Sequence, residues 1–422
     1  MTHGVQKLIG LLGVALLAGT TYAQETEIGY FNEPGKVSLN TFETVKSDTS
    51  AFDKVKVRVG GDFSLQYQAL EQETASGIAL LDLSSGFNLA TANLNIDVQL
   101  ADGVRMNLIT YLSSRHHRET WVKGGYIQFD KLPFLHSDAI DKIMEKVTVK
   151  IGHMEINYGD AHFRRTDNGR AILNPFVGNL VMDAFATEVG GEIYYQNNGF
   201  LGMVGITNGQ LDPTVTRHST DPSIYFKLGY DKQVNTDLRT RITGSYYSTN
   251  RTARNTLYAG DRGGSRYYYV LLPEDADTGE SNHTTGRFNP GFTSEVQAIM
   301  INPFVKYKGL EFFGTAEFSK GKSATETEER AATQLSGELL YRFGGNENFY
   351  IGGRYTTVNA ELAGYDDEVN VNRLQASVGW FMTKNVLAKL EYVNQEYKDY
   401  PTGVIFNGGK FNGVMLEATI SF

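Results

Sequence analysis

The last ten residues of the chain, 413–422, alternate between two kinds of side chain. One face would carry Val414, Leu416, Ala418, Ile420 and Phe422, and the other Met415, Glu417, Thr419 and Ser421. A period of two with one apolar face is typical of a β-strand whose two faces meet different media. The chain must therefore contain a sheet with an apolar face, and the fold has to supply apolar surroundings for it.

The amino-terminal end indicates export. Lys7 is followed by an apolar run over residues 8–18, and Thr21-Tyr22-Ala23 forms a small-residue cleavage site before Gln24. This pattern predicts a secretory signal peptide over residues 1–23, since the apolar run is too short for a membrane-spanning helix. The chain has no cysteine, so disulfides and thiolate metal sites are excluded.

Composition argues against helical membrane proteins and nucleic-acid binding. After the signal peptide no apolar run of about 18 residues remains, which excludes a bundle of spanning helices. The mean hydropathy is -0.31, as expected where only every second residue of a transmembrane strand faces lipid. The formal net charge is -9, which argues against nucleic acid as a partner.

From residue 54 onward the alternating pattern recurs in about sixteen segments. Tight connections at 101–103, 197–199, 308–309, 344–346 and 383–385 alternate with mostly long polar ones, the longest at 251–292. Short turns on one side and long loops on the other are typical of outer-membrane barrels. We therefore expect an all-β fold: a single transmembrane antiparallel β-barrel over residues 54–422, after a periplasmic lead-in segment at 24–53. A soluble β-sandwich, the alternative, would need several domains at this length, and no linkers separate them.

The third long loop, residues 157–184, carries the mixture of charges that most suggests function. It follows the predicted fifth strand and contains Arg164, Arg165, Arg170, Asp160 and Asp167. Its apolar residues need cover, which packing inside the barrel would supply. We expect these five residues to form a pore constriction. The alternative is a surface loop or subunit latch whose arginines pair with the aspartates.

Basic residues on the inward faces of the strands are candidates for the pore wall. The set comprises Lys54, Lys56, Arg58, Arg105, Lys146, Lys150, Arg239 and Arg241. Rings of arginine and lysine favour anions in a confined path. Acidic residues occupy inward positions too, so a general or sugar-permeable pore stays an equal alternative.

The overall plan resembles the phosphate-selective porin family (O and P type) of the bacterial outer membrane. The stretch 150–159 is similar to the strand that leads into the third loop of that family, and Phe422 resembles the terminal aromatic of its closing strand. The likeness covers the whole mature chain loosely, without a short diagnostic motif. It implies outer-membrane lipid as surroundings, the barrel assembly machinery reading Phe422 as an assembly signal, a homotrimer, and passive passage of small hydrophilic solutes or anions.

Other functions have weaker support in the sequence. An adhesin or a component of an export complex would use the loop 251–292 as its contact surface. A transporter for hydrophobic substrates would need an amino-terminal plug, and residues 24–53 are short and polar for one. Asp275, Asp277 and Glu280 hint at calcium, and His116-His117 at another metal, but neither fits a known ligand spacing. The sequence predicts no enzyme, no cofactor and no metal site.

Overall fold

The computed structural model describes residues 28, 31–44, 46, 52–113, 120–211, 215, 220–260, 267–276 and 284–422. The predicted signal peptide lies outside the described residues, as do His116, His117, Asp277 and Glu280.

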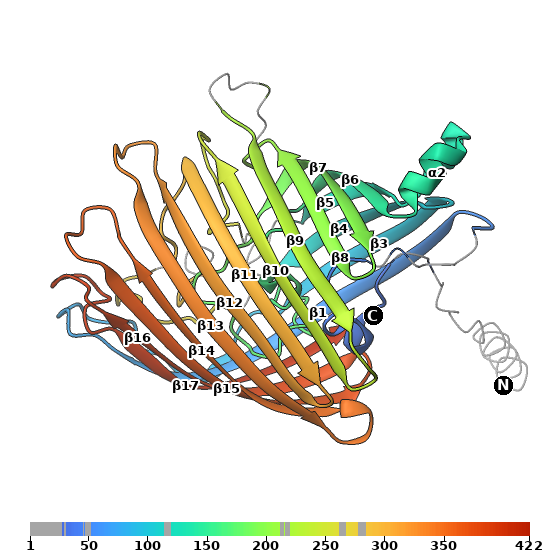
Figure 1. Cartoon of the computed structure of the whole chain (residues 1–422). Coiled ribbons are helices and arrows are strands. Elements are labelled where there is room, and N and C mark those ends of the chain that lie inside the picture. Colours follow the sequence, from blue (N-terminus) through green and yellow to red (C-terminus); the bar gives the residue numbers. More distant parts are fainter. Residues whose placement is uncertain are drawn as a thin grey trace, which may run out of the picture.

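The described chain forms one seventeen-stranded antiparallel sheet that closes on itself, because β1 pairs with both β3 and β17 (Figure 1). One strand, β2 (Gly86–Phe87), is a two-residue addition beside β1, so sixteen strands make the wall. The wall strands are β1 (Lys56–Glu73), β3 (Thr91–Ala101), β4 (Val104–Ser113), β5 (Trp121–Phe129), β6 (Val147–Glu155), β7 (Thr187–Asn197), β8 (Phe200–Thr207), β9 (Ser223–Gln233), β10 (Leu238–Thr249), β11 (Glu295–Tyr307), β12 (Leu310–Lys322), β13 (Arg330–Phe343), β14 (Phe349–Ala360), β15 (Val369–Thr383), β16 (Val386–Lys398) and β17 (Lys410–Ser421). The predicted barrel and its strand number are confirmed.

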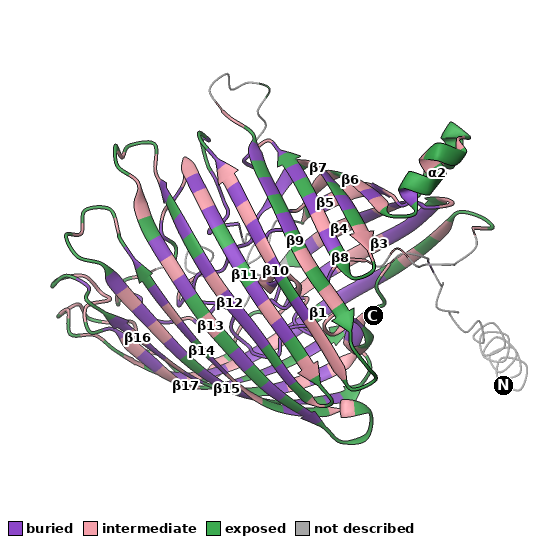
Figure 2. Cartoon of the chain, viewed as in Figure 1, coloured by how far each residue is buried: buried purple, intermediate pink, exposed green. Residues whose placement is uncertain are grey.

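Alternation along the strands produces an apolar outer belt. In β13, Leu335 and Leu339 on the outer face are 47% and 54% exposed, whereas Gln334 and Glu338 on the inner face are buried. The same banding runs along most of the wall (Figure 2). So much exposed apolar surface would be unstable in water. The belt therefore faces the hydrocarbon of a membrane, and the closed barrel is of the outer-membrane kind.

An aromatic row marks one rim of the belt. The rings of Phe343, Phe349 and Trp380 stack in sequence, with centroids 5.8 and 6.0 Å apart, and Tyr341 stacks on Phe343 at 5.9 Å. These residues lie at the short-turn ends of β13, β14 and β15. Aromatic side chains at this level sit at the headgroup boundary of a bilayer.

Tight turns close the hairpins at the same end. In the β7–β8 turn, Asn198 and Gly199 both have positive φ, 50° and 86°, as a type I′ turn requires. The β5–β6 connection is longer and holds two short helices, η3 (Pro133–Leu135) and α2 (Asp138–Met144). None of the helices in the described part of the chain is long and apolar enough to span a bilayer.

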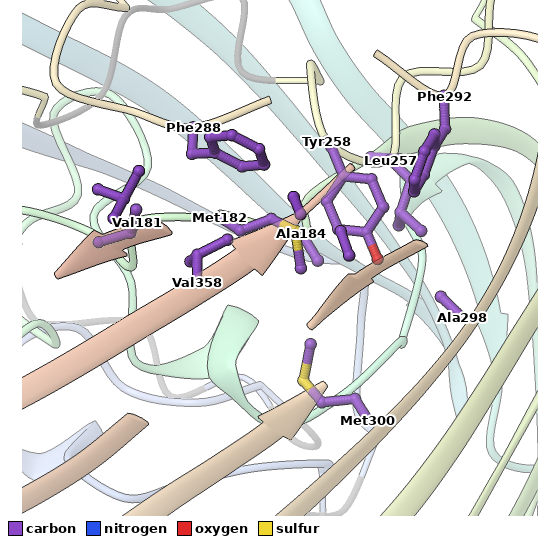
Figure 3. Packing of buried hydrophobic residues seen from close by; sticks show 14 of the residues in the cluster. Val181, Met182, Ala184, Leu257, Tyr258, Phe288, Phe292, Ala298, Met300 and Val358 are labelled. Atoms are coloured by element: carbon purple, nitrogen blue, oxygen red, sulfur yellow. The ribbon is translucent and has the colours of Figure 1, made fainter. Parts of the chain in front are cut away.

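Two loops from the opposite end fill much of the barrel interior. We call residues 156–186, which contain the short helix η4 (Ala161–Phe163), the inner loop, and residues 250–294 the outer loop. Figure 3 shows Val181 and Met182 of the inner loop beside Tyr258 and Phe288 of the outer loop. The sequence predicts a plainly polar loop at 251–292, yet its described parts bury several aromatic side chains. Inside a barrel those aromatic residues have apolar neighbours that the linear sequence does not reveal.

Candidate functional site in the barrel lumen

A cavity of about 290 Å³ lies in the lumen between the inner loop, the amino-terminal segment and the wall from β1 to β7. Its charged lining residues carry both signs: Glu33, Glu43, Arg58, Asp62, Asp97, Arg105, Lys123, Lys150, Glu155, Asp167 and Arg170. Polar and apolar side chains line this space in about equal measure, and the charged ones suit water and small hydrophilic solutes. This cavity lies in a part of the lumen that the two long loops leave open.

Arg164 anchors the inner loop to the wall. Its Nη2 donates to Glu311 at 2.8 Å and to Glu338 at 3.2 Å, on β12 and β13, and its Nη1 donates to Asn40. The guanidinium is buried and does not line the cavity. Its charge is therefore used in ion pairs, and solutes in the cavity do not contact it.

Arg165 holds the inner loop in its folded shape. Its Nε and Nη2 donate to Asp183 at 3.0 and 2.7 Å, and Asn179 donates to the same carboxylate at 3.1 Å. Tyr267 of the outer loop also donates to Asp183, at 2.5 Å, so the Asp183 carboxylate links the inner and outer loops. This is the arginine–aspartate pairing of the alternative interpretation, placed inside the barrel.

Asp160 belongs to a buried four-charge cluster. Arg241 donates to it through Nε and Nη2 at 2.8 and 2.9 Å, and Lys227 lies 2.8 Å away. The fourth member is Glu43, which contacts Lys227 at 3.0 Å and Arg241 at 2.7 Å. Burial favours the neutral form of Glu43, but the two cations outweigh it and lower its pKa to about 2. The two acidic and two basic side chains of this cluster neutralise one another.

Asp167 and Arg170 are the two predicted constriction residues that line the cavity. The Asp167 carboxylate accepts hydrogen bonds from Tyr111 of β4 and Lys123 of β5. Arg170 exchanges backbone hydrogen bonds with Asp167 at 3.0 and 3.1 Å, which closes a small hairpin. No ion pair joins the Arg170 guanidinium to a carboxylate in the described part of the chain. Arg170 interacts electrostatically with Asp62 of β1 without a direct ion pair, and it lines the cavity, where a solute can meet it.

The tip of this hairpin, Asn168 and Gly169, packs closely against the barrel wall. Asn168 adopts a positive φ of 52°, and its side chain donates to the backbone oxygen of Ala92 at 2.7 Å. A Cβ on Gly169 would lie 2.7 Å from the Ala92 Cα and 2.7 Å from the Asp62 backbone oxygen. Glycine is therefore required for this close approach, which fixes where Arg170 lies.

The eight predicted wall residues separate into three groups. Arg58, Arg105 and Lys150 line the cavity, with Arg58 and Arg105 paired to Asp97 and Asp130 at 2.7 and 3.0 Å. Arg239 and Arg241 pair with Asp231 at 2.6 and 3.3 Å, away from the cavity. Lys54, Lys56 and Lys146 lie at or beyond strand ends, and none of the three lines the cavity.

Lys123 is a cavity residue that the sequence does not single out. Its Nζ lies between Asp167 and Glu155, 3.2 Å from the latter. The β4–β5 register shifts so that Gly124 pairs with Ile109 while Val122 pairs with Thr110, which leaves Lys123 as a bulged residue. A bulge breaks the period of two, so alternation alone does not assign the faces of residues 121–129.

The amino-terminal segment also contributes to the lumen. Residues 31–44 and Lys46 contact wall strands from inside the barrel, and several of them line the cavity. This differs from a simple periplasmic lead-in. The sequence offered one signal, Phe42, whose buried ring packs against Phe163 and Phe304 with centroids 5.7 and 5.5 Å away. In a polar stretch without periodicity, the pattern around Phe42 does not show what it packs against.

Metal sites are not evident in the described chain, where no group of three or more histidine or acidic side chains is placed to hold an ion. The suggested calcium site stays untested, because Asp277 and Glu280 lie outside the described residues.

Comparison with known proteins places the fold among outer-membrane barrels. An anion-selective porin from Comamonas acidovorans superimposes with a TM-score of 0.53 at 12% identity, over 87% of this chain and 100% of that one. The outer-membrane channel DcaP of Acinetobacter baumannii gives 0.53 at 10% identity, over 87% and 98%. The trimer form of OmpT from Vibrio cholerae gives 0.51 at 10% identity, over 88% and 100%.

At this level of identity the likeness concerns the fold. No family model and no curated protein sequence matches the chain, so membership of the phosphate-selective family is not shown. The apolar belt and the matched barrels together place the chain in the outer membrane.

Proposed function

We propose that this barrel is a passive diffusion channel for small hydrophilic solutes. The observation that carries the proposal is the cavity of about 290 Å³ inside a closed barrel, whose lining includes charged residues of the wall and of the inner loop. Channels recognise solutes through the charges that line their narrowest part. The inner loop, by packing across the lumen, supplies such a narrow part.

A preference for anions, including phosphate, is the finer part of this proposal. Five basic side chains line the cavity, and Arg170 among them forms no direct ion pair in the described chain. A guanidinium in a confined space attracts oxyanions strongly, because it can donate two parallel hydrogen bonds. Six carboxylates line the same cavity, so we expect a modest preference. A homotrimer is proposed as well, on the strength of the trimeric barrel among the structural matches.

A planar lipid bilayer measurement tests the channel. The folded mature chain should give stable, ohmic conductance steps, and a salt gradient should give a reversal potential of anionic sign. Added phosphate should reduce the chloride current if oxyanions bind in the lumen. Folded protein without conductance steps would contradict the proposal.

The packed loops support a second candidate, a barrel that acts through partners. The inner and outer loops fill much of the lumen and bury many apolar side chains there. A barrel of this kind would show no conductance and would purify with a partner. The bilayer measurement therefore separates the two candidates.

A further inference from the structure

The amino-terminal segment follows the inside of the barrel wall near its short-turn end. Lys46 donates to the backbone oxygens of Asp130 and Val147, at 2.8 and 2.9 Å, where β5 ends and β6 begins. Thr44 accepts a hydrogen bond from Arg105 of β4 at 3.1 Å. These contacts fix one end of the segment on the wall.

The other end of the segment reaches the remaining strands in turn. Asn40 donates to Glu311 of β12 at 2.7 Å. The backbone N–H of Lys36 donates to the oxygen of Lys384, in the β15–β16 turn, at 2.7 Å. The backbone oxygen of Asn32 accepts from Arg58 of β1 at 2.9 Å. Glu43 contacts Lys227 of β9 and Arg241 of β10. Together, these contacts pass around most of the circumference of the barrel. We call residues 31–44 with Lys46 the collar.

Close packing shows that the collar is a built part of the barrel. Gly35 has a φ of +82°, and a Cβ there would lie 2.4 Å from the Lys384 oxygen. Phe42 is 3% exposed. Asn157 of the inner loop donates to Glu43 at 3.0 Å, and Asp160 shares the partners of Glu43. Collar and inner loop are therefore held by one buried cluster of charges.

The collar presents one acidic side chain to the cavity without a partner. Glu33 is exposed and lines the cavity, and no ion pair is recorded for it among the described residues. Arg170 of the inner loop lines the same cavity. Val37, also on the collar, is 54% exposed but does not line the cavity.

We propose that the collar is a second constriction of the channel, and that Glu33 on it determines ion selectivity in opposition to Arg170. This rests on the proposed channel function. A solute that crosses the lumen meets the guanidinium on the inner loop and the carboxylate on the collar, and the balance of the two sets the ion preference. Removing the carboxylate should shift the preference toward anions.

A cysteine introduced into this cysteine-free chain tests the proposal after the channel has folded. In a bilayer, Glu33→Cys should shift the reversal potential toward anions. A cationic methanethiosulfonate reagent should shift it further, an anionic one should reverse the shift, and both should lower the conductance. Val37→Cys, treated in the same way, should show no change of either quantity. Mass spectrometry verifies that both cysteines are labelled.

Deletion of residues 31–46 is the second variant and should raise the conductance. If labelled Glu33→Cys behaves as labelled Val37→Cys does, the collar has no role in selectivity and the inference is overturned. Wild-type protein without conductance steps would overturn the channel itself. Steps that the cysteine labels leave unchanged would overturn the collar proposal alone.

Discussion

Many buried charges in this barrel form ion pairs, and the partner decides what each side chain can do. Arg164, Arg165 and Asp160 are chemically suited to line a pore, yet each forms an ion pair with a buried partner. Arg170 differs because it forms no direct ion pair in the described chain, although it interacts electrostatically with Asp62. Removing one partner of a buried pair leaves the other without compensation, which costs far more than the pair itself contributes.

Arg164→Ala should therefore destabilise the protein by about 3 kcal/mol, toward the low end for a broken buried pair. The low end applies because Arg342 and Arg354 still contact Glu311 and Glu338, at 3.0 and 3.2 Å. The measurement is the free energy of unfolding in a urea titration in lipid vesicles. As a control, Lys131→Ala breaks an exposed pair with Asp102 and should cost about 0–1 kcal/mol. Equal costs for the two variants would contradict the prediction.

Glu43 should make the collar sensitive to strong acid. Its pKa is lowered from 4.5 to about 2, so the stability it contributes is present above pH 4.5 and is lost as the pH falls toward 2. The shift corresponds to about 3 kcal/mol at neutral pH. The difference in unfolding free energy between wild type and Glu43→Gln should shrink by about this amount between pH 5 and pH 2. A constant difference over that range would show that the ion pairs do not stabilise the collar.

At the scale of elements, the inner loop is fastened by wall residues that lie far apart in the sequence. Lys389 of β16 donates to the backbone oxygens of Asn174 and Phe176, at 3.1 and 3.0 Å. Gln334 of β13 exchanges hydrogen bonds with Met182 at 2.8 and 2.7 Å. Many such contacts satisfy backbone groups that would otherwise be buried without partners, so the loop keeps a single shape.

Arg170→Ala should weaken or abolish the proposed anion preference without unfolding the loop, because the hairpin is closed by backbone hydrogen bonds. The reversal potential in a salt gradient checks this, and a change of a single unpaired charge is expected to move it toward zero. Arg170→Lys keeps the charge and should retain most of the preference. An unchanged reversal potential in Arg170→Ala would show that Arg170 does not contribute to ion selectivity.

At the scale of the whole molecule, the outer belt determines the medium in which the barrel is stable. Leu335 lies on the outer face of β13, well inside the strand, while Tyr341 lies near the aromatic rim. Leu335→Arg should cost about 2–4 kcal/mol in a bilayer, and Tyr341→Arg about 0–1 kcal/mol, since the cost of a charge falls toward the interface. Unfolding from lipid vesicles measures both. Similar costs at the two positions would place the belt differently from our assignment.

Local pattern was enough to predict the wall. Val57 and Val59 of β1 and the apolar residues of β17 show their outward faces through alternation alone, and the tight turns show which end is which. A bulge defeated this reasoning in β5, where Lys123 interrupts the alternation. The inward positions of Arg58, Arg105 and Lys150 followed from the same alternation that assigned the outward faces.

The sequence by itself determined the barrel, because each strand is specified by neighbours two residues apart. Only the tertiary structure decided how the charges are used. Arg164 meets Glu311 across 147 residues and Glu43 meets Lys227 across 184, and no local pattern reports such partners. The alternation in the closing strand at 413–422 thus indicates by itself that the outer face of the barrel lies in a membrane. Which charge remains free in the lumen depended on how the inner loop and the collar pack inside the wall.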